Sequence, residues 1–449
     1  MRWTDPEVRQ ALGIEPGSAS IGFSGISTDT RQLAPEALFV ALRGERFDAH
    51  QFLAQARAGG AAGAVVAEGT PDQPGLVLYR VPDPLHALGR LARFRRHRIP
   101  GPVVAITGSN GKTSTKEMVA AVLGVRYRVH ATRKNLNNLV GVPLSILEAP
   151  DPAEALVIEA GASLPGEIAR AREIIDPSIG VITNVAAAHL EGLGGLERVM
   201  LEKLSLLDGV PVGVVGTEPA GLADAARKRA RKVVTAGLAG ADRTPSRVEL
   251  TGDGKPRVTV QGRTFLLDAR GRHQAGNAML ALTVGEILGL SLEPMAAALE
   301  NLALPGGRTQ LIQAGRMTIL DDSYNANPSS FRAVIDLARS LREGRRLVFV
   351  AGTMRELGRQ SEALHRETAG LLAALRPDLL AAVGEFAPAL APYQASLGER
   401  LLMAGDAAEL APLLGERLRG DELVVLKGSR GVALERLIPD LVSYASPSP

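Results

Sequence analysis

A chain of 449 residues is long enough for about three domains of ordinary size. Hydrophobic residues make up 45% and charged residues 22%, which is typical of globular cores, and a net charge of +3 argues against nucleic-acid binding through bulk charge. The absence of cysteine excludes disulfides, thiolate metal sites and thiol catalysis.

The N-terminal segment, Met1 to Glu7, lacks the apolar region of a signal peptide. No run of about 18 uncharged apolar residues occurs anywhere in the chain. The sequence therefore predicts a cytoplasmic protein that does not insert into a membrane. It is also expected to be a monomer.

Residues 1–99 alternate short apolar strands with helical stretches. Strands are expected at 25–31, 38–42, 64–66 and 76–79, and helices at 51–58 and 85–98. The arginine-rich segment 90–98 is expected to be a solvated helix face. The following residues, 99–102, contain Pro100 and Pro102 and are expected to form the linker that closes a first domain, 1–99.

Residues 100–304 are predicted to form a second domain in which strands and helices alternate. Apolar strands are expected at 103–107, 155–160, 179–184, 211–215 and 233–236, followed by a β-rich stretch at 247–267 and a helix at 273–288. This rhythm is typical of a doubly wound parallel sheet. A hinge is expected at Pro305-Gly306-Gly307.

The last domain, 305–449, repeats the α/β rhythm. Strands are expected at 317–321, 347–351, 380–383 and 423–426, and helices at segments such as 330–342 and 407–419. This unit has no glycine-rich lysine loop of its own. A ligand cleft is therefore expected between it and the second domain.

The segment Thr-Gly-Ser-Asn-Gly-Lys-Thr-Ser-Thr-Lys, residues 107–116, follows an apolar strand and begins a helix. Gly108 and Gly111 let the backbone approach an anion, and the helix start adds free N–H groups. Lys112 can neutralise the β- and γ-phosphates of a nucleotide, and the Thr113 hydroxyl can bind Mg²⁺. The alternative is an ordinary glycine turn. The common pattern has a glycine where this chain has Ile106, so the loop is predicted to be a variant phosphate loop.

Four further segments place polar groups at or after strand ends, where α/β folds carry their sites. Glu159 at one strand end can hold Mg²⁺. His189 follows another strand and is a candidate metal ligand, with a structural histidine as the alternative. Lys203, by itself, would be a surface lysine. The segment 321–330, Asp-Asp-Ser-Tyr-Asn-Ala-Asn-Pro-Ser-Ser, has more polar groups than a capping loop needs and is predicted to face a ligand.

These segments, together with His273-Gln-Ala-Gly-Asn277, resemble in order those of the Mur ligase family, which uses ATP to join an amino acid or dipeptide to a UDP-muramoyl peptide. The resemblance covers nearly the whole chain and accounts for Ile106. It implies an α/β fold with a small N-terminal UDP-binding domain, a central phosphate-loop ATPase domain with a doubly wound, mostly parallel sheet, and a C-terminal Rossmann-like domain. The segments 322–328 and 427–430 are most similar to members that add D-alanyl-D-alanine to UDP-N-acetylmuramoyl-tripeptide during peptidoglycan synthesis.

The resemblance implies roles for single residues in ATP and metal binding. The ATP phosphates would contact Gly108, Ser109, Asn110, Gly111, Lys112, Thr113 and Ser114. Asn277 would contact adenine, and Arg308 and Asp322 would close on the nucleotide. Of two expected Mg²⁺ ions, one would bind Thr113 and Glu159. The second would bind His189 and a carbamylated lysine, which by position is Lys203. Lys112, Glu159, His189 and Lys203 are thus the implied catalytic residues.

The substrates would contact residues from all three domains. The uridine diphosphate end would contact two N-terminal segments, 27–31 and 41–50, with Ser27, Thr28 and Arg31 as the implied residues. The polar loop of Asn135, Asn137 and Asn138 would lie near the γ-phosphate and the muramoyl peptide. The dipeptide would contact Tyr324, Asn325, Asn327 and Ser429. One departure is Thr353 before Met354, where this type of enzyme more often has aspartate.

Three other functions remain open from the sequence. A relative that adds the third-position diamino acid would be expected to carry an Asp-Asn-Pro-Arg-like loop, which residues 316–449 lack. Folylpolyglutamate synthetase lacks the long N-terminal uridine-binding domain that residues 1–99 resemble. A phosphate-loop switch or transporter-associated ATPase would hydrolyse ATP without any peptide acceptor.

Overall fold

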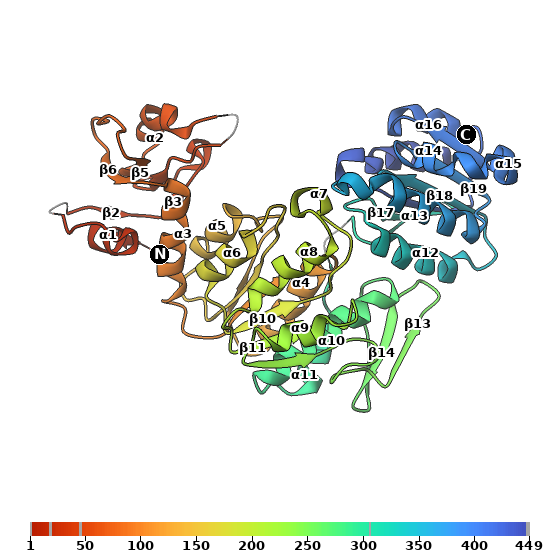
Figure 1. Cartoon of the computed structure of the whole chain (residues 1–449), viewed down its shortest axis with the longest axis horizontal. Coiled ribbons are helices and arrows are strands. Elements are labelled where there is room, and N and C mark those ends of the chain that lie inside the picture. Colours follow the sequence, from red (N-terminus) through yellow and green to blue (C-terminus); the bar gives the residue numbers. More distant parts are fainter. Residues whose placement is uncertain (1, 18–19, 45–46, 305–306, 446–449) are drawn as a thin grey trace.

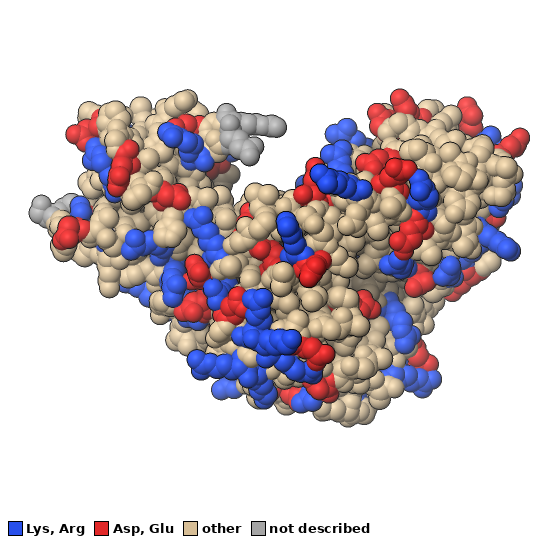
Figure 2. Space-filling model, viewed as in Figure 1, with Lys and Arg blue, Asp and Glu red and all other residues tan. Residues whose placement is uncertain are grey.

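The computed structural model describes the chain except residues 1, 18–19, 45–46, 305–306 and 446–449. Its elements form three lobes along the long axis (Figure 1): an N-terminal lobe (2–96), a central lobe (103–304) and a C-terminal lobe (307–445). The N- and C-terminal lobes rise from opposite ends of the central lobe (Figure 2). None of the helices in the described parts of the chain has the length and apolar character needed to cross a bilayer.

The N-terminal lobe contains a small parallel sheet of order β3-β4-β5-β6 and a two-stranded antiparallel sheet, β1-β2. The strands are β1 (Trp3–Thr4), β2 (Gly22–Phe23), β3 (Ile26–Ser27), β4 (Leu38–Val40), β5 (Gly63–Ala67) and β6 (Val77–Val81). The helices are α1 (Asp5–Leu12), α2 (Leu53–Ala58) and α3 (Pro84–Arg96), with 3-10 turns η1 (Thr30–Gln32) and η2 (Ala49–Phe52). In the core, the hydroxyl of buried Tyr79 donates to Asp5 at 2.7 Å.

The strand predicted at 25–31 is wrong beyond Ser27. Asp29 accepts the backbone N–H of Arg31 at 3.0 Å and begins the 3-10 turn η1. A side-chain oxygen that bonds a nearby N–H offers the backbone an alternative to a strand ladder. Ser27 therefore ends strand β3, whereas Thr28 and Arg31 lie in the turn that follows.

The solvated face predicted for 90–98 is confirmed at the exposed Arg90 and Arg93, but not at Arg95 and Arg96. Arg95 is 3% exposed and donates to the carbonyl of Ala149 at 3.0 Å. Arg96 donates to the carbonyls of Ile175 and Asp176. Guanidinium groups satisfy several carbonyls at once, so this end of α3 attaches the N-terminal lobe to the central lobe.

The central lobe has a six-stranded, fully parallel sheet of order β12-β11-β10-β7-β9-β8. Its strands are β7 (Val103–Thr107), β8 (Val129–Ala131), β9 (Ala155–Glu159), β10 (Ile179–Ile182), β11 (Val212–Val215) and β12 (Lys232–Thr235). A three-stranded antiparallel sheet follows: β13 (Arg247–Leu250), β14 (Pro256–Val260) and β15 (Arg263–Leu266). The predicted doubly wound sheet is confirmed, and only the short edge strand β8 was not foreseen.

The helices of this lobe begin with α4 (Lys112–Gly124), directly after β7. The others are α5 (Gly141–Leu147), α6 (Glu167–Ile175), α7 (Leu190–Leu193), α8 (Leu196–Leu204), α9 (Leu222–Arg227), α10 (Arg272–Ile287) and α11 (Leu292–Glu300), with the 3-10 turn η3 (Ser205–Leu207). In the strand order, β8 and β9 lie on one side of β7 and β10 to β12 on the other. Ligands of such sheets bind where the winding reverses, which here is the carboxyl end of β7.

The C-terminal lobe has a six-stranded sheet of order β16-β17-β21-β18-β19-β20, in which only β16 is antiparallel. Its strands are β16 (Gln310–Ala314), β17 (Met317–Asp322), β18 (Leu347–Gly352), β19 (Leu379–Val383), β20 (Leu401–Ala404) and β21 (Leu423–Lys427). The four predicted strands are present, whereas β16 and β20 at the two edges were not predicted. The predicted α/β class with mostly parallel sheets is confirmed.

The helices of this lobe are α12 (Pro328–Arg342), α13 (Ser361–Leu375), α14 (Phe386–Leu390), α15 (Gln394–Leu397), α16 (Ala407–Gly415) and α17 (Ile438–Ala445). Its 3-10 turns are η4 (Gly358–Gln360), η5 (Ala391–Tyr393), η6 (Gly398–Arg400), η7 (Arg430–Val432) and η8 (Leu434–Leu437). The helix expected at 407–419 thus ends at Gly415. Of the predicted hinge, Pro305 and Gly306 lie outside the described residues, and Gly307 has a left-handed φ of 74°.

The central and C-terminal lobes are packed together by a shared hydrophobic cluster. Leu190, Leu193 and Leu204 of the central lobe belong to the same buried cluster as Phe331 and Leu357 of the C-terminal lobe. Apolar burial of this kind stabilises the contact in rough proportion to its area. The two lobes that carry the predicted polar loops are therefore held face to face.

Candidate functional site

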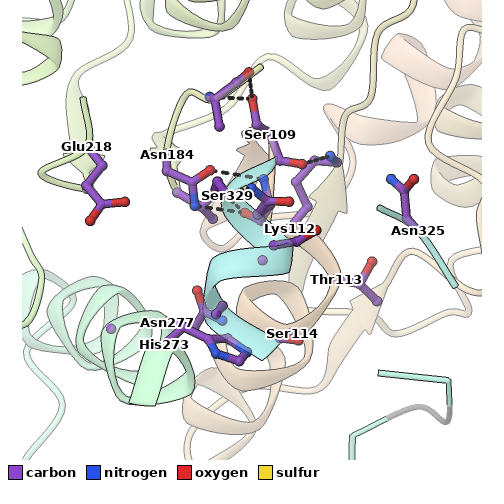
Figure 3. A pocket seen from close by; sticks show the side chains of 18 of the residues that line it. Ser109, Lys112, Thr113, Ser114, Asn184, Glu218, His273, Asn277, Asn325 and Ser329 are labelled. Carbon is purple, nitrogen blue, oxygen red and sulfur yellow. Dashed lines mark hydrogen bonds between the residues drawn. The ribbon is translucent and has the colours of Figure 1, made fainter. Parts of the chain in front are cut away.

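A cavity of about 1380 Å³ lies between the central and C-terminal lobes. Its walls include the loop after β7, the start of α10 and the segment after β17. Figure 3 shows His273 and Asn277 close together on one side, with Ser109, Asn184 and Ser329 grouped on another. The cavity brings together residues more than 200 positions apart, as the sequence analysis expected for a cleft between two α/β units.

The loop after β7 is shaped to face an anion. Gly108 and Gly111 have φ values of 149° and 76°, in the region that favours glycine. Lys112 folds over the loop and donates to the carbonyl of Gly108 at 2.8 Å. Burial lowers the pKa of Lys112 from its usual value. An ammonium that is enclosed beside the free N–H groups of a helix start is suited to a phosphate group.

The position of Gly111 gives a direct test of this loop. A Cβ there would lie 2.6 Å from Oδ1 of Asn277, and the backbone would be strained at its positive φ. We expect Gly111→Ala to lower the affinity for a non-hydrolysable ATP analogue by about tenfold or more, given strain of ~1–3 kcal/mol. Titration calorimetry measures this. Gly124→Ala is the control, because nothing lies within 4 Å of its added Cβ; equal affinities would contradict the assignment of this loop.

Thr113 and Glu159 form a hydroxyl–carboxylate pair at the floor of the cavity. The Thr113 hydroxyl donates to Glu159 at 2.8 Å, and the amide of Asn137 donates to the other carboxylate oxygen at 2.8 Å. Glu159 is only 2% exposed. Oxygen ligands of this type are those that Mg²⁺ prefers, so the arrangement fits the predicted role of both residues.

His189 lines the same cavity and begins α7 with a left-handed φ of 55°. Its Nδ1 contacts Oε2 of Glu356, which comes from the C-terminal lobe. This hydrogen bond, with smaller contributions from the charges of His189 and Lys112, holds the pKa of Glu356 below its usual value despite partial burial. A role for Glu356 could not be predicted from the sequence, because its partner His189 is 167 residues away and only the packing of the lobes brings them together.

Lys203 is 0% exposed, so the surface position expected of a helical lysine is wrong. Its Nζ is enclosed without a hydrogen-bond partner among the described residues. Burial, assisted by the positive charge of Lys112, lowers the pKa of Lys203 to about 7. A buried amine without a partner is costly. It is also largely able to lose its proton near neutral pH, as reaction with CO₂ requires.

No group of three histidine or acidic side chains in the described residues could by itself hold a metal ion. The candidates for metal binding are instead of mixed type: Thr113, Glu159, His189 and Lys203. The unpartnered amine of Lys203 fits such a centre only as a carbamate, because an ammonium would repel the ion. A carbamate would supply oxygen ligands of the kind that Mg²⁺ takes.

The wall on the side of α10 contains Asn277 and His273. Asn277 is nearly buried, donates from its amide to Gln274 at 2.9 Å and lies against Gly111. Burial lowers the pKa of His273, so the ring is neutral near pH 7. His273 belongs to the segment 273–277, in which the sequence alone predicts a role only for Asn277. His273 and Asn277 both line this wall of the cavity.

The C-terminal wall comes from the loop after β17. Asp322 accepts the Thr309 N–H at 3.1 Å and pairs with Lys427 at 2.7 Å. Lys427 also donates to the carbonyl of Asn325 at 2.6 Å. The Arg308 guanidinium lies over the Tyr324 ring, 4.5 Å from its centre. Lys427, which the sequence analysis included in a motif only, therefore holds this loop in shape.

Two asparagines join the phosphate loop directly to the C-terminal lobe. Asn327 donates from Nδ2 to Oδ1 of Asn110 at 2.7 Å, and Asn110 donates to Ser329 at 3.1 Å. Asn327 also begins α12 by accepting the Ser330 N–H. The backbone N–H of Asn110 is itself held by the Asn184 side chain. The loop that faces the phosphates is thus positioned by both lobes.

The remaining predicted residues are only partly brought together. Ser114, Asn135, Asn138, Arg308, Asp322, Tyr324 and Asn325 line the cavity. Ser429 does not; it is buried, and its hydroxyl accepts the Arg355 N–H at 2.9 Å. Ser27, Thr28 and Arg31 lie in the N-terminal lobe, away from the cavity, and of the segment 41–50 residues 45 and 46 lie outside the described residues. Arg31 pairs with Asp29 at 2.7 Å and lowers the pKa of that carboxyl to about 2.

The sequence and the structure are both similar to those of known proteins. The Mur ligase middle domain matches residues 106–285, and the Mur ligase, glutamate ligase domain matches 307–430. A UDP-N-acetylmuramoyl-tripeptide--D-alanyl-D-alanine ligase of Escherichia coli (strain K12) is 36% identical over 446 residues, which cover 96% of each chain. A crystal structure of MurF from Acinetobacter baumannii superposes with a TM-score of 0.89 at 31% identity and covers 99% of each chain. MurF ligase from Thermotoga maritima in complex with ADP gives 0.82 at 27% identity, with 94% of this chain and 97% of that one covered.

Proposed function

The chain belongs to the Mur ligase family, and on that basis we propose that it uses ATP to join D-alanyl-D-alanine to UDP-N-acetylmuramoyl-tripeptide, releasing ADP. The observation that carries the proposal is the cavity shared by a phosphate loop on one lobe and a polar loop on the other. The product is the UDP-muramoyl-pentapeptide of peptidoglycan synthesis. The names of the relatives favour this reaction over addition of a third-position diamino acid.

The reaction begins with the tripeptide carboxylate, which attacks the γ-phosphorus of ATP to form an acyl phosphate. Both partners are anions, so Lys112 lowers the repulsion between them and stabilises the transferring phosphoryl group. The amine of D-alanyl-D-alanine then attacks the acyl carbonyl, and phosphate leaves. Because an acyl phosphate hydrolyses readily, the packing of the C-terminal lobe over the phosphate loop serves to exclude water.

Nucleotide binding falls to the loop and the two walls around it. The phosphates are assigned to the loop residues Gly108, Ser109, Asn110, Gly111, Lys112, Thr113 and Ser114. Asn277 is assigned to adenine, and Arg308 and Asp322 approach the nucleotide from the C-terminal lobe. The ADP complex of the Thermotoga relative supports the proposal that this chain binds a nucleotide.

We also assign two Mg²⁺ ions to the site. Thr113 and Glu159 would hold one, and His189 with carbamylated Lys203 would hold the other. Once bound, the ions would screen the charges of the carboxylate and the phosphates. What supports the assignment is the hydroxyl–carboxylate pair together with the buried, unpartnered amine of Lys203.

The substrates are assigned to residues of all three lobes, which we take as domains 1–99, 100–304 and 305–449. Ser27, Thr28 and Arg31 would contact the uridine diphosphate end, and Asn135 and Asn138 the muramoyl peptide. Tyr324, Asn325 and Asn327 would contact the dipeptide. Ser429 is buried and would act indirectly, by holding the backbone at Arg355. We propose that the protein acts as a monomer in the cytoplasm, where the ATP that it consumes is made.

Release of ADP in a coupled assay tests this function. We expect ADP to form only when UDP-N-acetylmuramoyl-tripeptide and D-alanyl-D-alanine are both present, because the acyl phosphate must pass to the amine. ADP that depends instead on the dipeptide precursor and a diamino acid would assign the chain to the third-position reaction. Steady ATP hydrolysis without any acceptor would place it among phosphate-loop switches and overturn the proposal.

A further inference from the structure

Glu356 of the C-terminal lobe contacts His189, which lines the proposed metal-binding side of the cavity. Its Oε2 contacts Nδ1 of His189, and its charge is close enough to Lys112 to perturb the pKa of that group. Glu356 itself has a left-handed φ of 64°, so the backbone turns sharply to present this carboxylate. The contact joins a proposed metal ligand of one lobe to an anion of the other.

The contact is part of a larger docking of two short elements, α7 and η4. The Glu191 backbone N–H donates to the Glu356 carbonyl at 3.0 Å. A Cβ at Gly358, whose φ is 54°, would lie 3.0 Å from Cα of Glu191, so the two backbones meet almost directly. The flanking residues Leu190 and Leu357 are buried in one cluster. Figure 1 shows α7 at the boundary with the C-terminal lobe.

An imidazole has two nitrogens, and a carboxylate that accepts the N–H of one fixes the lone pair on the other. Here Glu356 occupies Nδ1, so the nitrogen that remains for a metal ion is Nε2. Histidine ligands in metal sites are commonly oriented in this manner by a carboxylate. The alternative is an ordinary ion pair between two lobes; Glu356 is 53% exposed on its side chain, and such pairs contribute little to stability.

We propose that Glu356 is a positioning residue that orients His189 for Mg²⁺, so that the C-terminal lobe completes the metal site of the central lobe. This inference rests on the proposed function and deepens it. Its consequence is that metal binding at His189 is coupled to docking of the lobe that carries the acceptor loop. The second ion would then be held tightly only when the lobe that receives the dipeptide is in place.

The test counts bound metal rather than turnover. Mn²⁺ is titrated into the protein with a non-hydrolysable ATP analogue, and free Mn²⁺ is followed by electron paramagnetic resonance. Of the two bound Mn²⁺ ions, we expect Glu356→Ala to lower the affinity for the weaker-bound one by about 10–100-fold. This is the usual effect of removing such a supporting carboxylate. Glu356→Gln, whose amide oxygen can still accept the N–H, should recover part of the loss. Glu362→Ala is the matched control, because the Glu362 side chain is 85% exposed on α13 and pairs with Arg366.

Gly358→Ala examines the docking separately, since it disturbs the approach of η4 to α7 and leaves Glu356 in the chain. We expect this variant also to bind the weaker-bound Mn²⁺ with lower affinity. Its radius of gyration in small-angle scattering should be larger than that of the wild type. The inference is overturned if Glu356→Ala binds both ions as the wild type does. If the wild type itself binds no Mn²⁺ together with nucleotide, it is the proposed function that fails, so the two outcomes can be told apart.

Discussion

Lys112→Ala and Glu159→Ala are each expected to abolish ligation while the fold remains intact. Lys112 lies over the phosphate loop, and Glu159 holds the Thr113 hydroxyl at 2.8 Å. Loss of one such contact to phosphate or metal should cost ~3–5 kcal/mol in the transition state, a factor of roughly 10²–10⁴ in rate. The measurement is ADP release with both substrates at saturating Mg²⁺, together with circular dichroism to check the fold.

Lys228→Ala is the matched control for these variants, because Lys228 is exposed after α9 and far in sequence from the loop. It should retain the wild-type rate. Turnover close to the wild type in Lys112→Ala or Glu159→Ala would show that the phosphates and the metal ion bind elsewhere. Loss of secondary structure in either variant would instead assign it a structural role.

Lys203→Ala is expected to reduce ligation by about two orders of magnitude, comparable to the loss of a metal ligand. The amine is buried without a partner, and its pKa of about 7 leaves much of it neutral and able to react with CO₂. Short carboxylic acids should restore part of the activity, because their oxygens can replace the missing carbamate. The measurement is the ADP-release rate with and without added acetate, and in buffers depleted of CO₂ for the wild type.

Lys203→Arg separates a carbamate from a simple positive charge. Arginine keeps the charge but is not carbamylated in this way, so this variant should be as inactive as Lys203→Ala and should not respond to acetate. Full activity in Lys203→Arg would rule the carbamate out. A crystal structure with both metal ions bound and a bare amine at Lys203 would do the same.

The parts of the fold that could be predicted are those encoded locally. The apolar run of β7, the glycines after it and Lys112 at the start of α4 lie next to one another in sequence. Buried parallel strands can also be predicted, because both faces of the sheet are covered and the strand sequences are almost continuously apolar. The strand expected through Asp29 failed because a single carboxylate captured a backbone N–H two residues on. The edge strands β8, β16 and β20 pair on one side only, so their sequences need not be continuously apolar.

The parts that could not be predicted depend on contacts between distant segments. The burial of Arg95 requires the carbonyl of Ala149, which lies 54 residues later. A role for Glu356 becomes evident only from its contact with His189. Ser429 is buried, and its hydroxyl accepts the Arg355 N–H, a contact that the sequence does not indicate. The resemblance to a family supplied the residue types of the site. It did not supply which side chains support one another across the two lobes.

The cavity's polar groups come from two lobes, and this division affects how the specificity of the enzyme can evolve. Groups suited to ATP, such as Lys112 and Glu159, are encoded in the central lobe, whereas Tyr324 and Asn325 are encoded in the C-terminal lobe. On the proposed assignment, the residues that bind ATP and those that contact the incoming amine therefore lie in different stretches of the chain. A substitution in the C-terminal lobe can alter which amine is accepted without disturbing the ATP-binding residues of the central lobe. The same ATP-dependent reaction can therefore be used with different amines.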